Sequence, residues 1–119
     1  MIRIRHQIRK QESEGVHMYT IGIDIGGTYI KGGIVNDKNE ILCRVSKPTE
    51  SSRGAEAVIK TIGEIITELK ADKQHAKGKC RGIGIGCPGT IDADKGIVLY
   101  SNNLNWENVL LAKKLGKQE

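Results

Sequence analysis

The sequence predicts a mixed α/β fold, in which a three-stranded antiparallel meander is followed by a helix and a further strand. Apolar residues alternate with a period of two in three successive segments, 19–25, 29–35 and 40–46, which are joined by short turns. The period then changes to that of a helix over 57–73, and a β-branched run follows it. A chain of 119 residues fits one small domain of this kind.

The first predicted strand has one apolar face, formed by alternating isoleucines, and Asp24 lies at the end of the other face. The segment Gly26–Thr28 follows as a tight turn, because glycine tolerates the positive φ that a short hairpin needs. The turn cluster 36–39, with sequence NDKN, separates the second strand from the third. Short turns between successive strands predict antiparallel neighbours.

The helical segment carries a single apolar stripe, and Ser51 or Ser52 is expected to cap its start, with Glu56 in its first turn. The stripe consists of Val58, Ile62, Ile65, Ile66 and Leu69.

A buried strand is expected over 80–86, and Pro88 and Gly89 turn the chain after it into a hairpin-like excursion. The segment 106–115, WENVLLAKKL, predicts a final short helix that Asn105 caps and Gly116 ends.

The first seventeen residues show no clear strand or helix period. We expect residues 1–17 to be a disordered arm, or an upstream start that is not part of the native fold, and residues 18–119 to form the folded unit.

Composition argues against several classes of partner. The net charge is +5, but aromatic residues make up only 3% of the chain, too few for a base-stacking platform. The basic cluster 70–81 is interpreted as a solvated helix end, so no nucleic-acid partner is expected. No apolar run has the length of a membrane span or a signal-peptide core, so we expect a cytoplasmic protein without membrane contact.

The cysteine pattern predicts reduced thiols and no zinc site in this segment. Cys43, Cys80 and Cys87 form no CxxC pair, and no histidine lies at ligand spacing from them.

The turn DIGGT is a candidate cradle for nucleotide phosphates. The backbone amides of Gly26 and Gly27 and the hydroxyl of Thr28 can donate to phosphate oxygens. Asp24 can hold Mg²⁺ through water, and Lys31 can add positive charge. The spacing alone leaves a plain Gly-Gly hairpin turn equally open, and no Walker P-loop occurs in the sequence.

A second glycine-rich stretch, 84–89 with sequence GIGCPG, formally matches the dinucleotide fingerprint. That fingerprint requires a helix to start inside it, whereas Pro88 and turn residues follow here. We interpret the stretch as bare strand backbone that leads into a rigid loop.

The combination of IGIDIGGTYIKGGIV, GIGIGCPGTID and SNNLNW resembles the sugar kinases of the ROK family, the bacterial glucokinase and N-acetylhexosamine kinase group. The resemblance covers nearly all of residues 19–116. It implies the N-terminal lobe of an actin-like ATPase (ribonuclease H-like) fold, whose two lobes close on ATP and a sugar. It also implies a role for the DIGGT residues at the ATP phosphates and the metal. The residues that it implies near the sugar hydroxyls are Gly89, Thr90, Asn102 and Asn103, although turn chemistry remains an alternative for the two asparagines.

The resemblance implies ATP-dependent phosphorylation of a hexose, with glucose as the expected acceptor and ATP and Mg²⁺ as cofactors. It places the general-base aspartate, the cysteine-rich zinc motif and the adenosine-binding lobe beyond Glu119. We therefore expect no kinase turnover from the 119 residues alone, and we expect self-association through the bare inter-lobe face. A sugar-responsive transcriptional repressor and a non-catalytic remnant are the alternatives; residues 1–17 are too short for a helix-turn-helix domain.

Overall fold

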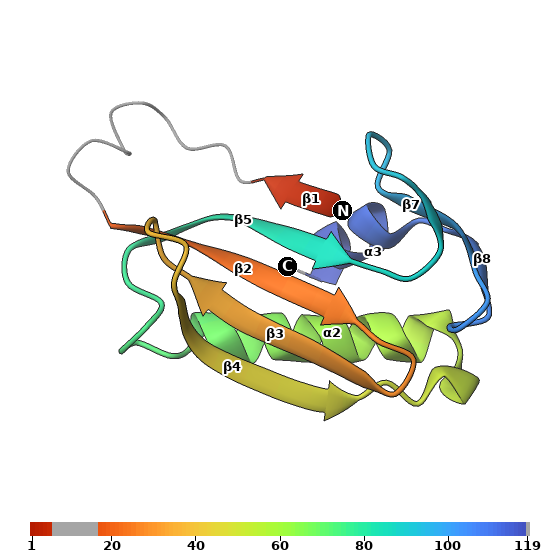
Figure 1. Ribbon diagram of the computed structural model, residues 1–119, viewed down its shortest axis with the longest axis horizontal. Coiled ribbons are helices and arrows are strands. Elements are labelled where there is room, and N and C mark those ends of the chain that lie inside the picture. Colours follow the sequence, from red (N-terminus) through yellow and green to blue (C-terminus); the bar gives the residue numbers. More distant parts are fainter. Residues whose placement is uncertain (6–16, 119) are drawn as a thin grey trace.

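A computed structural model describes residues 1–5 and 17–118 of the chain. Its main body is a five-stranded mixed sheet in the order β1-β5-β2-β3-β4, and Figure 1 shows helix α2 running across one face of it. The pair β2–β5 is parallel and the other pairs are antiparallel. The predicted mixed α/β class is confirmed.

The bounds of the elements of the larger sheet agree with the predicted meander. They are β2 (Met18–Ile25), β3 (Tyr29–Val35), β4 (Ile41–Pro48) and, after the helix, β5 (Lys79–Gly86). A second sheet has three antiparallel strands, β6 (Thr90–Asp92), β7 (Ile97–Ser101) and β8 (Trp106–Val109), and its first two strands form the predicted hairpin-like excursion.

The helix α2 (Ala55–Lys70) buries the predicted apolar stripe completely, and the isoleucines of β2 and β3 meet it. Gly32 on β3 marks the closest approach, because a Cβ there would lie 2.6 Å from Cγ2 of Ile65. The core therefore lies between α2 and the sheet, and Asp24 and Lys31 occupy the opposite face.

The start of α2 differs from the expected serine cap. A 3-10 turn, η1 (Ser51–Arg53), takes up both serines, and Gly54 with φ 94° precedes the helix without a side-chain cap. Glu56 lies in the first turn of α2 as expected and forms an ion pair with Lys114.

The last predicted helix begins later than expected. Residues Trp106–Val109 form strand β8, and the helix α3 spans Leu111–Gln118. Asn105 and Asn108 have φ values of 56° and 51°, in the left-handed region, which interrupts any right-handed helix across this segment. Gly116 accordingly lies inside α3 and does not end it.

Four residues of the segment expected to be a disordered arm or a non-native start form a strand in the structure. Strand β1 (Ile2–Arg5) pairs antiparallel with β5, and Ile2 is fully buried. Its sequence, IRIR, alternates apolar and charged residues with a period of two, a strand signal that the sequence analysis missed, and the edge that it pairs with is supplied by the tertiary fold. Residues 6–16, which complete the expected arm, lie outside the described residues.

Neither described helix combines the length and the apolar character that crossing a bilayer requires.

Candidate functional site

The acidic residue near the end of β2 lies between two neighbouring strands. Asp24 is paired in register with Lys31 on β3 and with Gly86 on β5, and its side chain is exposed. A Cβ at Gly86 would lie 3.7 Å from Oδ1 of Asp24, so the carboxylate rests over bare backbone. Asp24 and Lys31 both line a groove of about 580 Å³. A carboxylate and an ammonium group therefore face solvent on the same side of the sheet.

The turn between β2 and β3 is closed by its own backbone. The Gly26 amide donates to the Tyr29 carbonyl oxygen over 2.9 Å. A Cβ at Gly26 would lie 2.7 Å from that same oxygen, which explains why glycine is needed there. Since the Gly26 amide is engaged within the turn, the backbone and hydroxyl groups that can meet a ligand belong to the exposed residues Gly27 and Thr28.

A residue that the sequence analysis missed fixes this turn from outside. Thr49 follows β4, is fully buried, and donates its hydroxyl to the Gly26 carbonyl oxygen over 2.7 Å. Its amide donates to the Thr28 carbonyl oxygen over 2.8 Å. Both bonds hold the turn by its carbonyls and leave the outer side of the turn to solvent. No local signal in the sequence marks Thr49, because its partners lie in the turn between β2 and β3, more than twenty residues away in the chain.

The structure brings the loop between β7 and β8 next to this turn. A Cβ at Gly27 would lie 3.9 Å from Cβ of Asn103, so the predicted phosphate and sugar segments meet at this point. The side chains of Asn102 and Asn103 are both exposed. Asn102 is engaged locally, since its Oδ1 accepts a hydrogen bond from the Tyr100 hydroxyl over 3.3 Å and its carbonyl accepts the Asn105 amide. The local hydrogen bonds of Asn102 therefore fit the alternative of a turn residue, whereas Asn103 lies beside Gly27.

The other two residues expected near the sugar, Gly89 and Thr90, lie at the start of β6 in the same three-stranded sheet. Gly89 has a φ of 122°, and a Cβ there would lie 2.1 Å from the Tyr100 carbonyl oxygen, so only glycine fits. Thr90 opens β6 and pairs with Tyr100. Gly89 thus packs β6 against β7 closely and sets the position of the loop that carries the asparagines.

Two polar atoms that flank this loop are buried without a hydrogen-bond partner among the described residues. They are Oγ of Ser101 and Nε1 of Trp106. Native proteins satisfy nearly all such atoms, so each of these two carries an uncompensated desolvation cost in the protein by itself. Next to β5, burial raises the pKa of the Cys87 thiol to about 11, so this thiol is neutral near pH 7.

Comparison with known proteins identifies the family. The family model described as "ROK family" matches residues 20–118. The chain belongs to the ROK family. The fold is the N-terminal lobe of the actin-like ATPase architecture, as the resemblance implied.

Individual ROK proteins show how far the similarity extends. Over 99 residues the chain is 40% identical to a glucokinase from Thermotoga maritima, a match that covers 82% of this chain and 30% of that protein. It is 35% identical over 92 residues to the xylose repressor of Caldicellulosiruptor bescii, covering 76% of this chain and 23% of the repressor. The structure of a ROK family glucokinase from Streptomyces griseus, in complex with glucose and AMPPNP, superposes with a TM-score of 0.73 at 28% identity. That match covers 84% of this chain and 30% of the glucokinase, so the chain spans less than a third of the length of these relatives.

Proposed function

We propose that this chain supplies the phosphate-binding turn and part of the sugar site of an ATP-dependent hexose kinase, with glucose as the acceptor. The observation that carries the proposal is the position of Asn103 beside Gly27, where a Cβ added to the glycine would lie 3.9 Å from the Asn103 Cβ. It brings a candidate phosphate cradle and a candidate sugar loop together, as transfer between ATP and a sugar hydroxyl requires. The relative from Streptomyces griseus, whose structure contains glucose and AMPPNP, supports the choice of ligands.

The residues of the turn fit a hydrated metal–nucleotide complex. Asp24 offers an exposed carboxylate beside bare glycine backbone, which suits Mg²⁺ held through water. Bound there, Mg²⁺ would neutralise negative charge on the phosphate oxygens. The Thr28 hydroxyl and the amides of Gly27 and Thr28 would donate to the phosphate oxygens, and Lys31 would add positive charge opposite Asp24.

The sugar would lie over the loop between β7 and β8. The amide side chain of Asn103 can both donate to and accept from hydroxyl groups, and Asn102 offers its remaining lone pair and its NH₂ donors. Gly89 and Thr90 would shape the floor of this subsite. We propose that the general base lies outside these 119 residues, so the 119 residues alone should show no turnover in a coupled ADP-release assay.

A chimaera tests the proposal directly. Residues 20–118 of this chain replace the matching segment of the Thermotoga maritima glucokinase, and glucose-dependent ADP release is measured. We expect activity in the chimaera, and we expect Asp24→Asn to reduce kcat by at least about 100-fold, because charge stabilisation of the transferring phosphate dominates this chemistry. Asp37→Asn, in the exposed turn after β3, is the matched control and should leave kcat unchanged.

A folded chimaera that releases no ADP, or an Asp24→Asn chimaera with full activity, would contradict the proposal. A sugar-responsive repressor is the second candidate, because the Caldicellulosiruptor bescii relative is named a xylose repressor. A chimaera that binds glucose in calorimetry without transferring phosphate would favour the repressor.

A further inference from the structure

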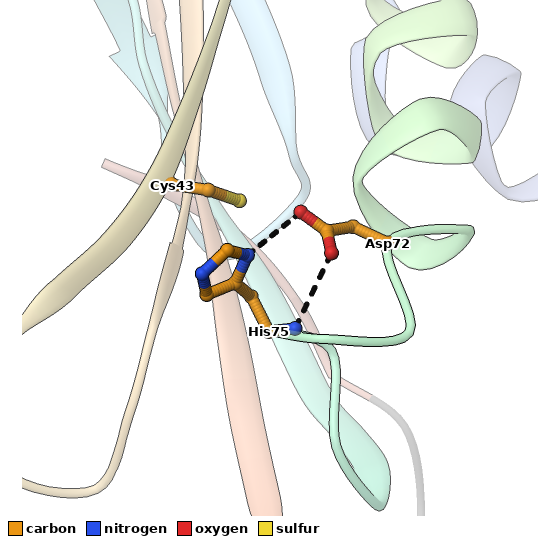
Figure 2. Close-up of side chains that lie close together, drawn as sticks. All are labelled: Cys43, Asp72 and His75. Atoms are coloured by element: carbon orange, nitrogen blue, oxygen red, sulfur yellow. Dashed lines mark hydrogen bonds and ion pairs between the residues drawn. The ribbon is translucent and has the colours of Figure 1, made fainter.

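A second cluster of reactive side chains lies far from the turn, where β4 meets the end of α2. Figure 2 shows that Cys43 on β4 points toward Asp72 and His75, which belong to the turn after α2. One potential metal-ligand atom from each residue lies within 4.8 Å of the other two. The sequence predicts no zinc site because it has no CxxC pair, but the fold joins these three residues from two separate segments.

The Asp72 carboxylate is oriented by the backbone. Its Oδ1 accepts the Gln74 amide over 3.1 Å and the His75 amide over 3.3 Å, as Figure 2 draws for His75. Its Oδ2 lies 2.8 Å from Nδ1 of His75. One carboxylate oxygen is therefore fixed by amides, and the other faces the imidazole and the thiol. Carboxylate and histidine ligands of metal sites are commonly oriented by such outer hydrogen bonds.

The three side chains are each partly exposed to solvent and partly buried. The side chains of His75 and Asp72 are 30% and 32% exposed, and Cys43 is half-buried between exposed neighbours on the edge strand β4. A metal could enter from solvent, and a water molecule could complete its coordination.

A nucleophilic thiol is a poorer interpretation of the cluster. Burial raises the pKa of Cys43, and its hydrogen bond to the Asp72 carboxylate raises it further, so the free thiol stays protonated near pH 7. Reactive cysteines require an electropositive environment, which a carboxylate does not provide.

We propose that Cys43, Asp72 and His75 bind a divalent transition-metal ion, with Zn²⁺ the best match. One thiolate, one imidazole nitrogen and one carboxylate oxygen form a ligand set that Zn²⁺ accepts in tetrahedral geometry, with solvent in the fourth position. Harder cations such as Mg²⁺ prefer oxygen ligands throughout. The ion replaces the thiol proton, and the proton of a neutral His75 ring is carried by the nitrogen that does not bind the ion. Binding therefore releases the thiol proton to solvent and weakens as the pH falls.

The bound ion would tie the edge strand β4 to the end of α2. Cys43 lies near the start of β4, whereas Thr49, which holds the β2–β3 turn, follows the end of that strand. The metal site is therefore separate from the proposed phosphate site, and the two proposals can fail independently.

The test uses Co²⁺ and Zn²⁺ on the full chain. In a Cys80→Ser/Cys87→Ser background, in which Cys43 is the only thiol, we expect one Co²⁺ per chain and a thiolate-to-cobalt charge-transfer band that Zn²⁺ abolishes by competition. Replacing Cys43 as well, by Cys43→Ser, should remove the band. Asp72→Asn and His75→Gln should each weaken Zn²⁺ binding by at least about 10-fold. The controls Asp94→Asn and His17→Gln, at exposed positions outside the cluster, should leave the affinity unchanged.

A second measurement needs no variant and therefore does not depend on the variants folding. Mass spectrometry of the unmodified chain should show that Zn²⁺ slows alkylation of Cys43 much more than alkylation of Cys87. Absence of Co²⁺ binding, an affinity unaffected by Cys43→Ser and His75→Gln, or equal protection of both cysteines would overturn the proposal.

Discussion

Replacing Thr49 by valine should loosen the turn that carries the candidate phosphate site. Valine keeps the shape of the buried side chain but removes the hydroxyl that donates to the Gly26 carbonyl oxygen over 2.7 Å. The backbone bond from the Thr49 amide to the Thr28 carbonyl oxygen does not depend on the side chain and should persist. The substitution thus removes one of the two bonds from Thr49 to the turn.

The expected cost follows from the burial of both partners. A net hydrogen bond contributes about 0.5–1.5 kcal/mol, and a buried acceptor left without a donor costs about 1–3 kcal/mol. Thr49 is fully buried and Gly26 is half-buried, so water can reach the orphaned carbonyl in part. We expect a loss of about 1–2 kcal/mol in the free energy of unfolding, or roughly 4–8 °C in Tm for a chain of this size.

Urea denaturation followed by circular dichroism measures this loss, with Thr67→Val on the exposed face of α2 as the matched control. The control should change the free energy of unfolding by less than about 0.5 kcal/mol. Thr49→Ser, which keeps the hydroxyl, should retain the hydrogen bond to Gly26 and lose only the contacts of one methyl group. If Thr49→Val unfolds at the wild-type urea midpoint with an unchanged m-value, the hydroxyl does not hold the turn and the reasoning is refuted.

Three further predictions concern the core, the pH dependence and the sugar loop. Gly32→Ala should destabilise the chain by about 1–3 kcal/mol in urea denaturation, because its Cβ would lie 2.6 Å from the Cγ2 of Ile65, whose χ1 is stiff in a helix. Gly22→Ala is the control and should be nearly neutral, since no atom lies within 4 Å of a Cβ there. Burial raises the pKa of Cys87 from 9.0 to about 11, so between these pH values the thiol stays protonated in the folded state and ionises in the unfolded state. The free energy of unfolding should therefore fall by about 1–2 kcal/mol between pH 9 and pH 11, and it should fall less in Cys87→Ala. Equal losses in both proteins would count against a raised pKa at Cys87. Ser101→Ala should leave the free energy of unfolding unchanged or raise it by up to about 1 kcal/mol, because the buried Oγ has no hydrogen-bond partner among the described residues. A lower Tm in this variant would show that Oγ has a partner.

The sequence predicts most of the fold because its periodic segments are long. The alternation of isoleucines in β2 and the apolar stripe of α2 each span enough residues to identify the element and its buried face. The prediction is wrong at Trp106–Val109, because apolar spacing over four residues fits a strand and a helix alike. The positive φ values of Asn105 and Asn108 decide between them, and these depend on how the loop packs.

The sequence by itself determined the meander, the helix that covers it and the position of the DIGGT turn, since these follow from local period and from glycine chemistry. Only the tertiary structure placed Asn103 beside Gly27, the Thr49 hydroxyl on the Gly26 carbonyl and Cys43 beside Asp72 and His75. Each of these contacts joins residues from separate elements. The register of the strands and the docking of α2 set the distances between those elements, and neither leaves a local signature in the chain.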